Sequence, residues 1–245
     1  MIILSVSMPK SGSAWYFNLT NDLLVAVGQA DIRDLREKYR LDFLEGPTCR
    51  LTNLKPTTLA RLLRLHFQGH TFVVKTHRPL DRRGRFLLAT GVAKASYIYR
   101  DPRDVLVSAL DHGRRLRAEG QIHSFARLVT FEDGLTFVED HLAVGQSWIA
   151  QPGVFVTRYE DVLADTPAEL GRLAHYLGVA AAEQTLERIA AAYRRPDEDS
   201  ISAEKGQLHF NKGIAGRYRQ VLTSAEIATC NQRFAAYLPR LGYPA

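Results

Sequence analysis

The stretch Ser7–Trp15, which reads SMPKSGSAW, carries residue types that together can bind an anion. Lys10 supplies a cation, Ser11 and Ser13 supply hydroxyls, and Gly12 lets backbone amides come close to an oxyanion. The common nucleotide loop is G-x-x-x-x-G-K-[ST], whereas here the lysine precedes the single glycine. The stretch therefore predicts an oxyanion site of an unusual type, which can hold a phosphate without a metal ion.

The elements expected on either side of this stretch place it where phosphate sites occur. Ile2–Val6 is a short apolar run rich in β-branched residues, which is typical of a buried strand. From Ala14 to Val27 the apolar residues recur at helical spacing on one face. Because the first amides of a helix have no partner inside it, they point into the preceding loop and can bind an anion there.

Strand and helix patterns alternate along the rest of the chain. Buried strands are expected at 71–74, 95–99 and 154–157, and helices at 102–117, 166–177, 183–193 and 223–237. A long polar loop is expected at 194–213. This alternation predicts an α/β fold with a mostly parallel sheet flanked by helices, a three-layer sandwich like that of P-loop NTPases. We expect residues 1–245 to form a single domain.

A second anion-binding residue is expected where the strand at 95–99 ends. Arg100 stands at this strand end, where a nucleotide kinase would need a carboxylate to bind Mg²⁺. Asp101 follows directly, but its position before Pro102 is typical of a helix N-cap. The alternative of a P-loop kinase acting on a small molecule is thus weakened, because its metal ligand is missing.

Five short motifs resemble, in family order, those of the cytosolic-type sulfotransferases. PKSGSAW resembles the 5′-phosphosulfate loop P-K-S-G-T-T-W, VKTHRP the catalytic segment K-T-H-x-P, and YRDPRDVLVS the 3′-phosphate element. RYEDV and FNKGIAGRY resemble the strand R-Y-E-D-[ML] and the loop R-K-G-x-x-G-D-W. Together they span Pro9 to Tyr218, nearly the whole chain.

The resemblance implies a donor, 3′-phosphoadenosine 5′-phosphosulfate (PAPS), and a product, adenosine 3′,5′-bisphosphate (PAP), with no metal ion. It places Lys10 at the bridging oxygen of the donor, Arg100 and Ser108 at the 3′-phosphate, and Trp15 and Tyr159 at the adenine. From the residues alone, Trp15 could equally pack in the core. The full set that the resemblance assigns to the donor is Lys10, Ser11, Gly12, Ser13, Ala14, Trp15, Arg100, Ser108, Tyr159, Asn211, Lys212 and Gly213.

His77 is the candidate general base for an acceptor hydroxyl. An imidazole of near-neutral pKa suits this task, and within K-T-H-x-P we favour it over a strand-end histidine bonded to backbone. Lys75 lies two residues earlier on the same strand face, so it and Lys10 are expected to stabilise charge on the sulfuryl oxygens and the leaving phosphate. Attack is expected to be in-line, with most of the rate coming from positioning and electrostatics.

Several departures from the family pattern occur. Ser13-Ala14 replaces the paired threonines, and Asn211 replaces an arginine at the 3′-phosphate, so Arg217 or Arg219 could compensate there. The threonine that contacts adenine has no clear counterpart, although Ser200 or Ser202 are candidates. The dimer motif survives only in part, so the choice between monomer and homodimer stays open.

Composition sets weaker limits. A net charge of +6 favours an anionic partner, but no basic stripe interleaved with aromatics supports the alternative of a nucleic-acid binder. Cys49 and Cys230 lack metal or redox spacing, and the apolar residues at 1–7 are too few to span a membrane, so a cytoplasmic protein is expected.

The acceptor is left undetermined by the sequence. A hydroxyl of a phenol, an alcohol, a sugar, a lipid or a natural product fits about equally, in a pocket built from loops at 31–53, 80–91 and 113–141. The arginine-rich run at 82–85 is expected to be a solvated loop, and His112 to lie on the surface.

Overall fold

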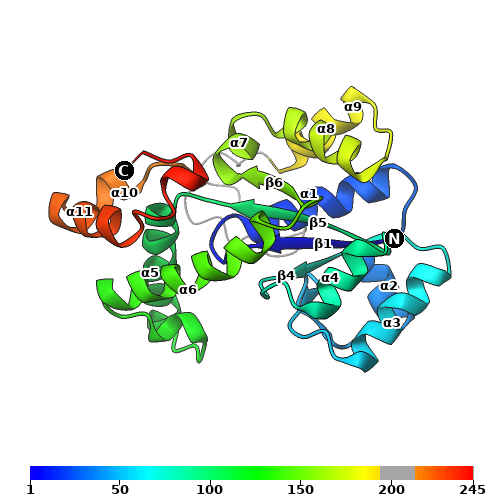
Figure 1. Cartoon of the computed structure of the whole chain (residues 1–245), viewed down its shortest axis with the longest axis horizontal. Helices are drawn as coiled ribbons and strands as arrows, with labels where there is room; N and C mark the ends of the chain where they lie inside the picture. The colour runs from blue at the N-terminus through cyan, green and yellow to red at the C-terminus, as the bar shows by residue number, and fades with distance from the viewer. Residues whose placement is uncertain (194–212, 245) are drawn as a thin grey trace.

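Six strands form one sheet at the centre of the protein. The computed structural model describes residues 1–193 and 213–244. The strands are β1 (Ile2–Ser7), β2 (Leu44–Glu45), β3 (Arg50–Leu51), β4 (Phe72–Thr76), β5 (Ala93–Tyr99) and β6 (Phe155–Arg158), in the order β2-β3-β4-β1-β5-β6. All neighbouring pairs are parallel except β2–β3, which confirms the predicted mostly parallel sheet (Figure 1).

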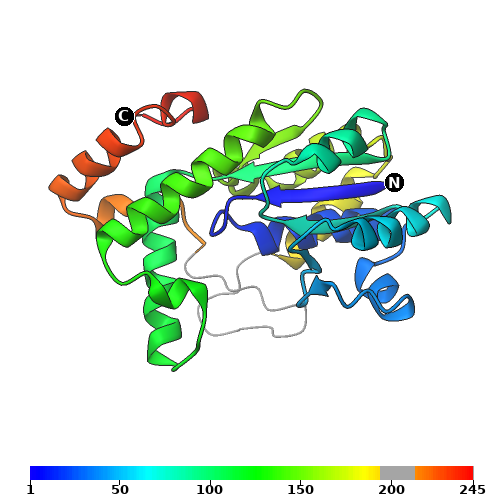
Figure 2. The ribbon, with the colours of Figure 1, turned by 60° about the horizontal axis from the view of Figure 1, so that its bottom comes forward.

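Helices cover both faces of this sheet, as expected for parallel strands joined by crossovers. They are α1 (Ser13–Ala26), α2 (Ile32–Lys38), α3 (Pro56–Phe67), α4 (Arg82–Ala89), α5 (Pro102–Ala118), α6 (Phe131–Ile149), α7 (Tyr159–Ala164), α8 (Thr166–Leu177), α9 (Glu183–Ala192), α10 (Tyr218–Val221) and α11 (Ser224–Arg233), with 3₁₀ turns η1 (Ser124–Arg127) and η2 (Pro239–Leu241). Figure 2 shows α4 and α6 on one side of β1 and α1 on the other. The predicted α/β three-layer fold is therefore confirmed.

The buried apolar residues form two clusters. The larger one lies around the sheet, where Ile2, Ile3 and Phe72 are fully buried. The smaller one joins α5 and α6 to the C-terminal helix α11 through residues such as Leu106, Leu135 and Phe234. The second cluster thus attaches the C-terminal part of the chain to the helices that follow β5.

Two segments expected to be irregular are helical. Residues 82–85 open α4, in which the Asp81 side chain caps the amide of Gly84 at 2.8 Å and Leu87 is buried. Residues 113–141 include the end of α5, η1 and half of α6. These predictions were wrong because one buried side chain per turn is enough to hold a short helix against the core. Such a helix has too few apolar residues for a helical period to be recognised in a polar sequence. The last predicted helix also ends early, at Arg233, although its Thr223–Glu226 capping box is present.

Arg103, on the first turn of α5, is a fully buried cation. Its guanidinium donates to both oxygens of Asp101, at 2.9 and 2.8 Å, and to Asn231 at 2.9 Å, and it lies 4.4 Å from the centre of the Tyr218 ring. Asp101 also caps α5 through the amide of Arg103, as the sequence predicts. This group therefore links the helix start to the C-terminal part of the chain.

Removing the carboxylate of this pair is expected to destabilise the fold strongly. Asp101→Ala leaves a buried guanidinium without its counter-charge, so the free energy of unfolding should fall by about 3–5 kcal/mol. Urea unfolding followed by circular dichroism measures the change. The matched control is Asp140→Ala on an exposed position of α6, for which about 0.5 kcal/mol or less is expected. Equal losses in both variants would contradict the role assigned to Asp101.

Among the described residues, none of the helices has both the length and the apolar character needed to cross a membrane.

Candidate active site

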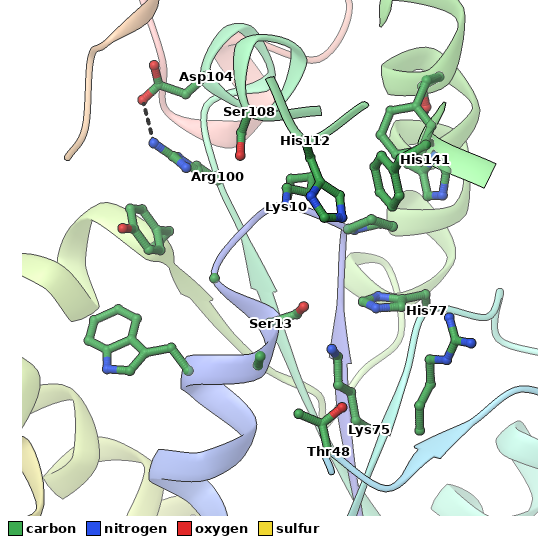
Figure 3. A pocket seen from close by; sticks show the side chains of 18 of the residues that line it. Lys10, Ser13, Thr48, Lys75, His77, Arg100, Asp104, Ser108, His112 and His141 are labelled. Atoms are coloured by element: carbon green, nitrogen blue, oxygen red, sulfur yellow. Dashed lines mark hydrogen bonds and ion pairs between the residues drawn. The ribbon is translucent and has the colours of Figure 1, made fainter. Parts of the chain in front are cut away.

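The carboxyl ends of four parallel strands meet around one cavity of about 700 Å³. The loop after β1, His77 after β4, Arg100 after β5 and Tyr159 after β6 all line it. Figure 3 shows Ser13 and Lys75 in a shared space beside His77, with Lys10, Ser108 and Arg100 farther along it. The two anion-binding segments predicted from the sequence therefore face a single cavity.

The loop between β1 and α1 has a backbone suited to an oxyanion. Lys10 and Gly12 both adopt left-handed conformations, with φ of 70° and 79°. Gly12 is the N-cap of α1 without a side-chain hydrogen bond, and the first turn of that helix contains no acidic residue. Ser13, Ala14 and Trp15, whose amides begin the helix, line the cavity. The positive end of α1 is thus directed at the site.

Gly12 is required here for space as well as for its backbone conformation. A Cβ at this position would lie 2.6 Å from the Tyr159 ring, which is closer than real carbon contacts allow. Tyr159 in turn packs edge-on against Trp15, with ring centres 5.7 Å apart. The loop and the two aromatic rings predicted to hold adenine therefore form one packed unit.

Ser11 differs from the prediction. Its side chain is fully buried, does not line the cavity, and donates to the carbonyl oxygens of Met8 and Ile98, at 2.5 and 3.2 Å. Its amide also donates to Met8, at 3.2 Å. The hydroxyl of Ser11 holds the loop against the end of β5, and Ser13 is the loop serine that faces the cavity.

Two buried lysines, Lys10 and Lys75, line the cavity, and Lys75 lies near His77. Burial, with Arg115 and Arg100 nearby, lowers the pKa of Lys10 to about 8. Burial, with Arg50 and Lys10 nearby, also lowers the pKa of Lys75 to about 8. Both shifts arise because cations are crowded in a poorly hydrated space, which is the situation that binding of an anion relieves.

His77 is held in a defined tautomer. Its Nδ1 lies 2.7 Å from the carbonyl oxygen of Ser7 at the end of β1. Because a carbonyl only accepts, Nδ1 carries the proton and Nε2 carries a lone pair. Burial, followed by the charge of Lys75, lowers the pKa of His77 to about 3, so the ring is neutral. His77 is thus bonded to the backbone through Nδ1 and still has Nε2 available as a base, so the two interpretations of this residue are compatible.

Arg100 stands at the other end of the cavity. Its Nη2 donates to Asp104 at 3.2 Å and to the carbonyl oxygen of Ile214 at 2.7 Å, and its guanidinium lies 4.5 Å from the centre of the Tyr159 ring. Its Nε is buried and has no hydrogen-bond partner among the residues that the structure describes. A buried N–H without a partner is costly, so this position favours an anionic acceptor from a ligand.

The predicted C-terminal contacts are described in part. Gly213 and Ile214 line the cavity. Asn211 and Lys212 lie outside the described residues, as do Ser200 and Ser202. Glu160 and Asp161, which also follow β6, do not line the cavity, and they bind Tyr243 and Arg158 instead.

Sequence reasoning placed the segment 113–141 at the acceptor pocket but did not identify the side chains that form the opposite wall of the cavity. Five rings from α5, η1 and α6 contact one another in a chain and line it: His112, His123, Phe125, Phe137 and His141. His112 is therefore not the surface residue that we expected. Its position one helical turn after Ser108 was a clue that it could face the site. The packing of η1 against α5, however, could not be inferred from the sequence.

The hairpin of β2 and β3 closes another side of the cavity. Glu45 and Arg50, paired at 2.6 Å, line it together with Thr48. Arg50 is opposite Lys75 in the parallel register of β3 and β4, so it adds a further cation near the reacting groups. Strands this short give no sequence pattern of their own.

Comparison with known proteins assigns the family. Residues 2–242 match the model of the sulfotransferase domain. The chain belongs to the sulfotransferase family. Human Sulfotransferase 4A1 is 26% identical over 258 residues, which cover 97% of this chain and 79% of that protein. The expected family resemblance is thereby confirmed, and the chain is a sulfotransferase.

Solved structures support the same fold. Retinol dehydratase in a complex with retinol and PAP covers 97% of this sulfotransferase and 81% of that chain, at 19% identity and a TM-score of 0.60. Mouse sulfotransferase SULT7A1 complexed with PAP covers 97% of this chain and 84% of its own, at 17% identity and a TM-score of 0.58. These similarities show a shared fold over nearly the whole chain.

Proposed function

We propose that this sulfotransferase moves a sulfuryl group from PAPS to a hydroxyl group of a small molecule, without a metal ion. The observation that supports the donor most directly is that the helix-start loop at Lys10 and the arginine at position 100 line one cavity. A donor with a phosphate at each end of an adenosine would satisfy both. PAP in the related solved structures agrees with this choice.

The residues present fit such a donor. The 5′ end would lie against the amides of Ser13 and Ala14 beside Lys10, and the 3′-phosphate against Arg100 and Ser108. There the Nε of Arg100, which has no partner within the described ranges, would gain an acceptor. The adenine would lie against Trp15 and Tyr159. Asn211, Lys212 and Gly213 remain proposed contacts from the C-terminal segment.

His77 would take the proton of the acceptor hydroxyl on Nε2. The donor supplies a sulfuryl group, whose transfer forms an S–O bond to the acceptor oxygen and breaks the S–O bond to the 5′-phosphate. Lys10 and Lys75 would balance the charge that grows on the leaving phosphate and on the sulfuryl oxygens. A bound anion near His77 raises the pKa of its ring, because nearby negative charge favours the imidazolium, and this strengthens the base.

The pH dependence follows from these shifts. His77 is neutral well below pH 6, whereas Lys10 and Lys75 lose their protons near pH 8, about the pKa of both. We expect kcat/KM for the donor to stay level from about pH 5.5 to 7.5 and to fall above about pH 8, since it reports groups of the free enzyme. A steady-state profile at an acceptor concentration well below its KM measures this. An acid limb near pH 6.5, the ordinary value for histidine, would contradict the neutral, buried His77.

An acceptor screen with ³⁵S-labelled PAPS tests the function. Phenols, alcohols, sugars, lipids and natural-product scaffolds are offered, and labelled product and PAP release are both measured, with and without chelator. Turnover that survives chelation supports the proposal. Loss of turnover on chelation, or transfer of phosphate from ATP–Mg²⁺ in place of sulfate, would favour a kinase instead.

Further parts of the proposal concern the whole protein. Residues 1–245 act as a single domain in a cytoplasmic setting, in keeping with the free buried cysteines Cys49 and Cys230. The partner is a small-molecule acceptor and not a nucleic acid, and either a monomer or a homodimer is compatible with the site.

A further inference from the structure

We propose that Arg217 binds the 3′-phosphate of the donor and so makes the site prefer nucleotides that carry this group over those that lack it. This inference rests on the proposed function. Its guanidinium forms an ion pair with Asp111 and would also bind the 3′-phosphate when the donor is present. Arg217 occupies a position where the resembled loop has aspartate, so the family pattern does not assign it this role.

The backbone of Arg217 is fixed by one buried carboxylate. Asp104, whose side chain is fully buried, accepts from the amide of Gly216 at 2.7 Å and from that of Tyr218 at 2.9 Å. These are the residues directly before and after Arg217. The segment is therefore held against α5 with the Arg217 side chain in a defined place.

The same carboxylate also holds Arg100. Nη2 of Arg100 is 3.2 Å from Asp104 and 2.7 Å from the carbonyl oxygen of Ile214, three residues before Arg217. Both arginines line the cavity, and so does Ser108. Figure 3 shows Arg100, Asp104 and Ser108 together at one end of it. Asp104 thus holds both Arg100 and the backbone of Arg217 at the end of the cavity proposed for the 3′-phosphate.

The contact with Asp111 places Arg217 one helical turn from Ser108. Ser108 and Asp111 are three residues apart on α5 and so share a face. The contact uses Nη1, one nitrogen of a guanidinium that has five N–H donors, and the side chain is only 16% exposed. Arg217 can therefore offer further donors to an anion next to Ser108.

Both carboxylates at this end are already hydrogen-bonded within the protein. Asp111 accepts hydrogen bonds from Arg114, at 3.1 Å, and from Arg217. Asp104 accepts from Arg100 and from the two backbone amides on either side of Arg217. Of the two arginines considered from the sequence as substitutes for the arginine missing at 211, Arg219 lies 4.7 Å from the centre of the Tyr218 ring and does not line the cavity. Arg217 is the one that the fold brings into the site.

Nucleotide discrimination tests the proposal. The dissociation constants of PAP and of adenosine 5′-monophosphate, which lacks the 3′-phosphate, are measured by displacement calorimetry, and their ratio is compared among variants. Arg217→Ala should reduce the preference for PAP by about 10- to 100-fold, the value of one or two charge-assisted hydrogen bonds. Arg217→Lys should retain part of the preference, because the charge remains without the planar fork. Arg219→Ala, the matched control, should leave the ratio unchanged.

The outcomes separate this inference from the function on which it rests. If Arg217→Ala weakens both nucleotides equally, or weakens neither, Arg217 merely pins the segment to α5 and the inference is wrong. Asp111→Asn removes the pin but keeps Arg217, so a preserved preference supports the proposal and a loss like that of Arg217→Ala overturns it. A wild-type protein with no preference for PAP would overturn the donor assignment itself.

Discussion

His77→Ala is expected to lower kcat by about 10²- to 10⁴-fold, the usual contribution of a positioned general base. The imidazole lines the cavity beside Lys75, is neutral, and has Nε2 left as acceptor because Nδ1 donates to Ser7. Removing it leaves the phosphate-binding loop and Arg100 in place, so the dissociation constant of PAP should change by less than about threefold, well under 1 kcal/mol. Single-turnover assays and calorimetry measure the two effects.

The control for this variant is a histidine outside the site. His175→Ala changes an exposed residue of α8 that does not line the cavity, and wild-type kcat is expected. Wild-type kcat in His77→Ala would contradict the base while leaving the donor site standing. A loss of PAP affinity as large as the loss of rate would instead show that the bond to Ser7 matters for structure.

Lys10→Met is expected to lower kcat by about 10²- to 10³-fold, as when one preorganised electrostatic donor is removed. Lys10 is a buried cation in the loop between β1 and α1, and burial, with Arg115 and Arg100 nearby, lowers its pKa to about 8. Such a charge gains most when the leaving phosphate becomes more negative, so kcat should fall more than PAP affinity does. Rates with saturating donor, together with calorimetry, measure the two losses.

Lys94→Met is the matched control for Lys10. Its ammonium donates to the carbonyl oxygen of Tyr176 at 2.7 Å near the start of β5, away from the cavity. The variant tests a partly buried lysine of the same sheet that has no role in the site. If Lys10→Met and Lys94→Met kept the same rate, the electrostatic role of Lys10 would be refuted.

The central strands and their helices could be predicted from sequence because their patterns are local. The apolar runs that became β1, β4, β5 and β6 were each found, with ends within two residues of those observed. The N-cap at Asp101, the capping box at Thr223 and Glu226, and the left-handed end of α8 at Gly178 depend on neighbouring residues alone, and all three are present.

The parts of the site that the sequence did not indicate depend on contacts between residues far apart in the chain. The turn η1 packs against α5 where Gly113 leaves room, and the Arg117 guanidinium donates to the carbonyls of Ala126 and Leu128, at 3.0 and 2.8 Å. This packing brings His123 and Phe125 over the cavity. No period of 2 or 3.6 residues marks such a segment, so its place could not be predicted.

The sequence by itself determined that a strand, a lysine-containing loop and a helix start would follow one another, because each element is coded by residues next to one another. Tertiary structure alone decided that His77 is neutral, since its pKa depends on burial and on Lys75 and on a carbonyl 70 residues away in the chain. It also decided that Ser11 faces inward and that Arg217 enters the site through Asp104 and Asp111. Desolvation and charge pairing act through space, so they exist only once the chain has folded.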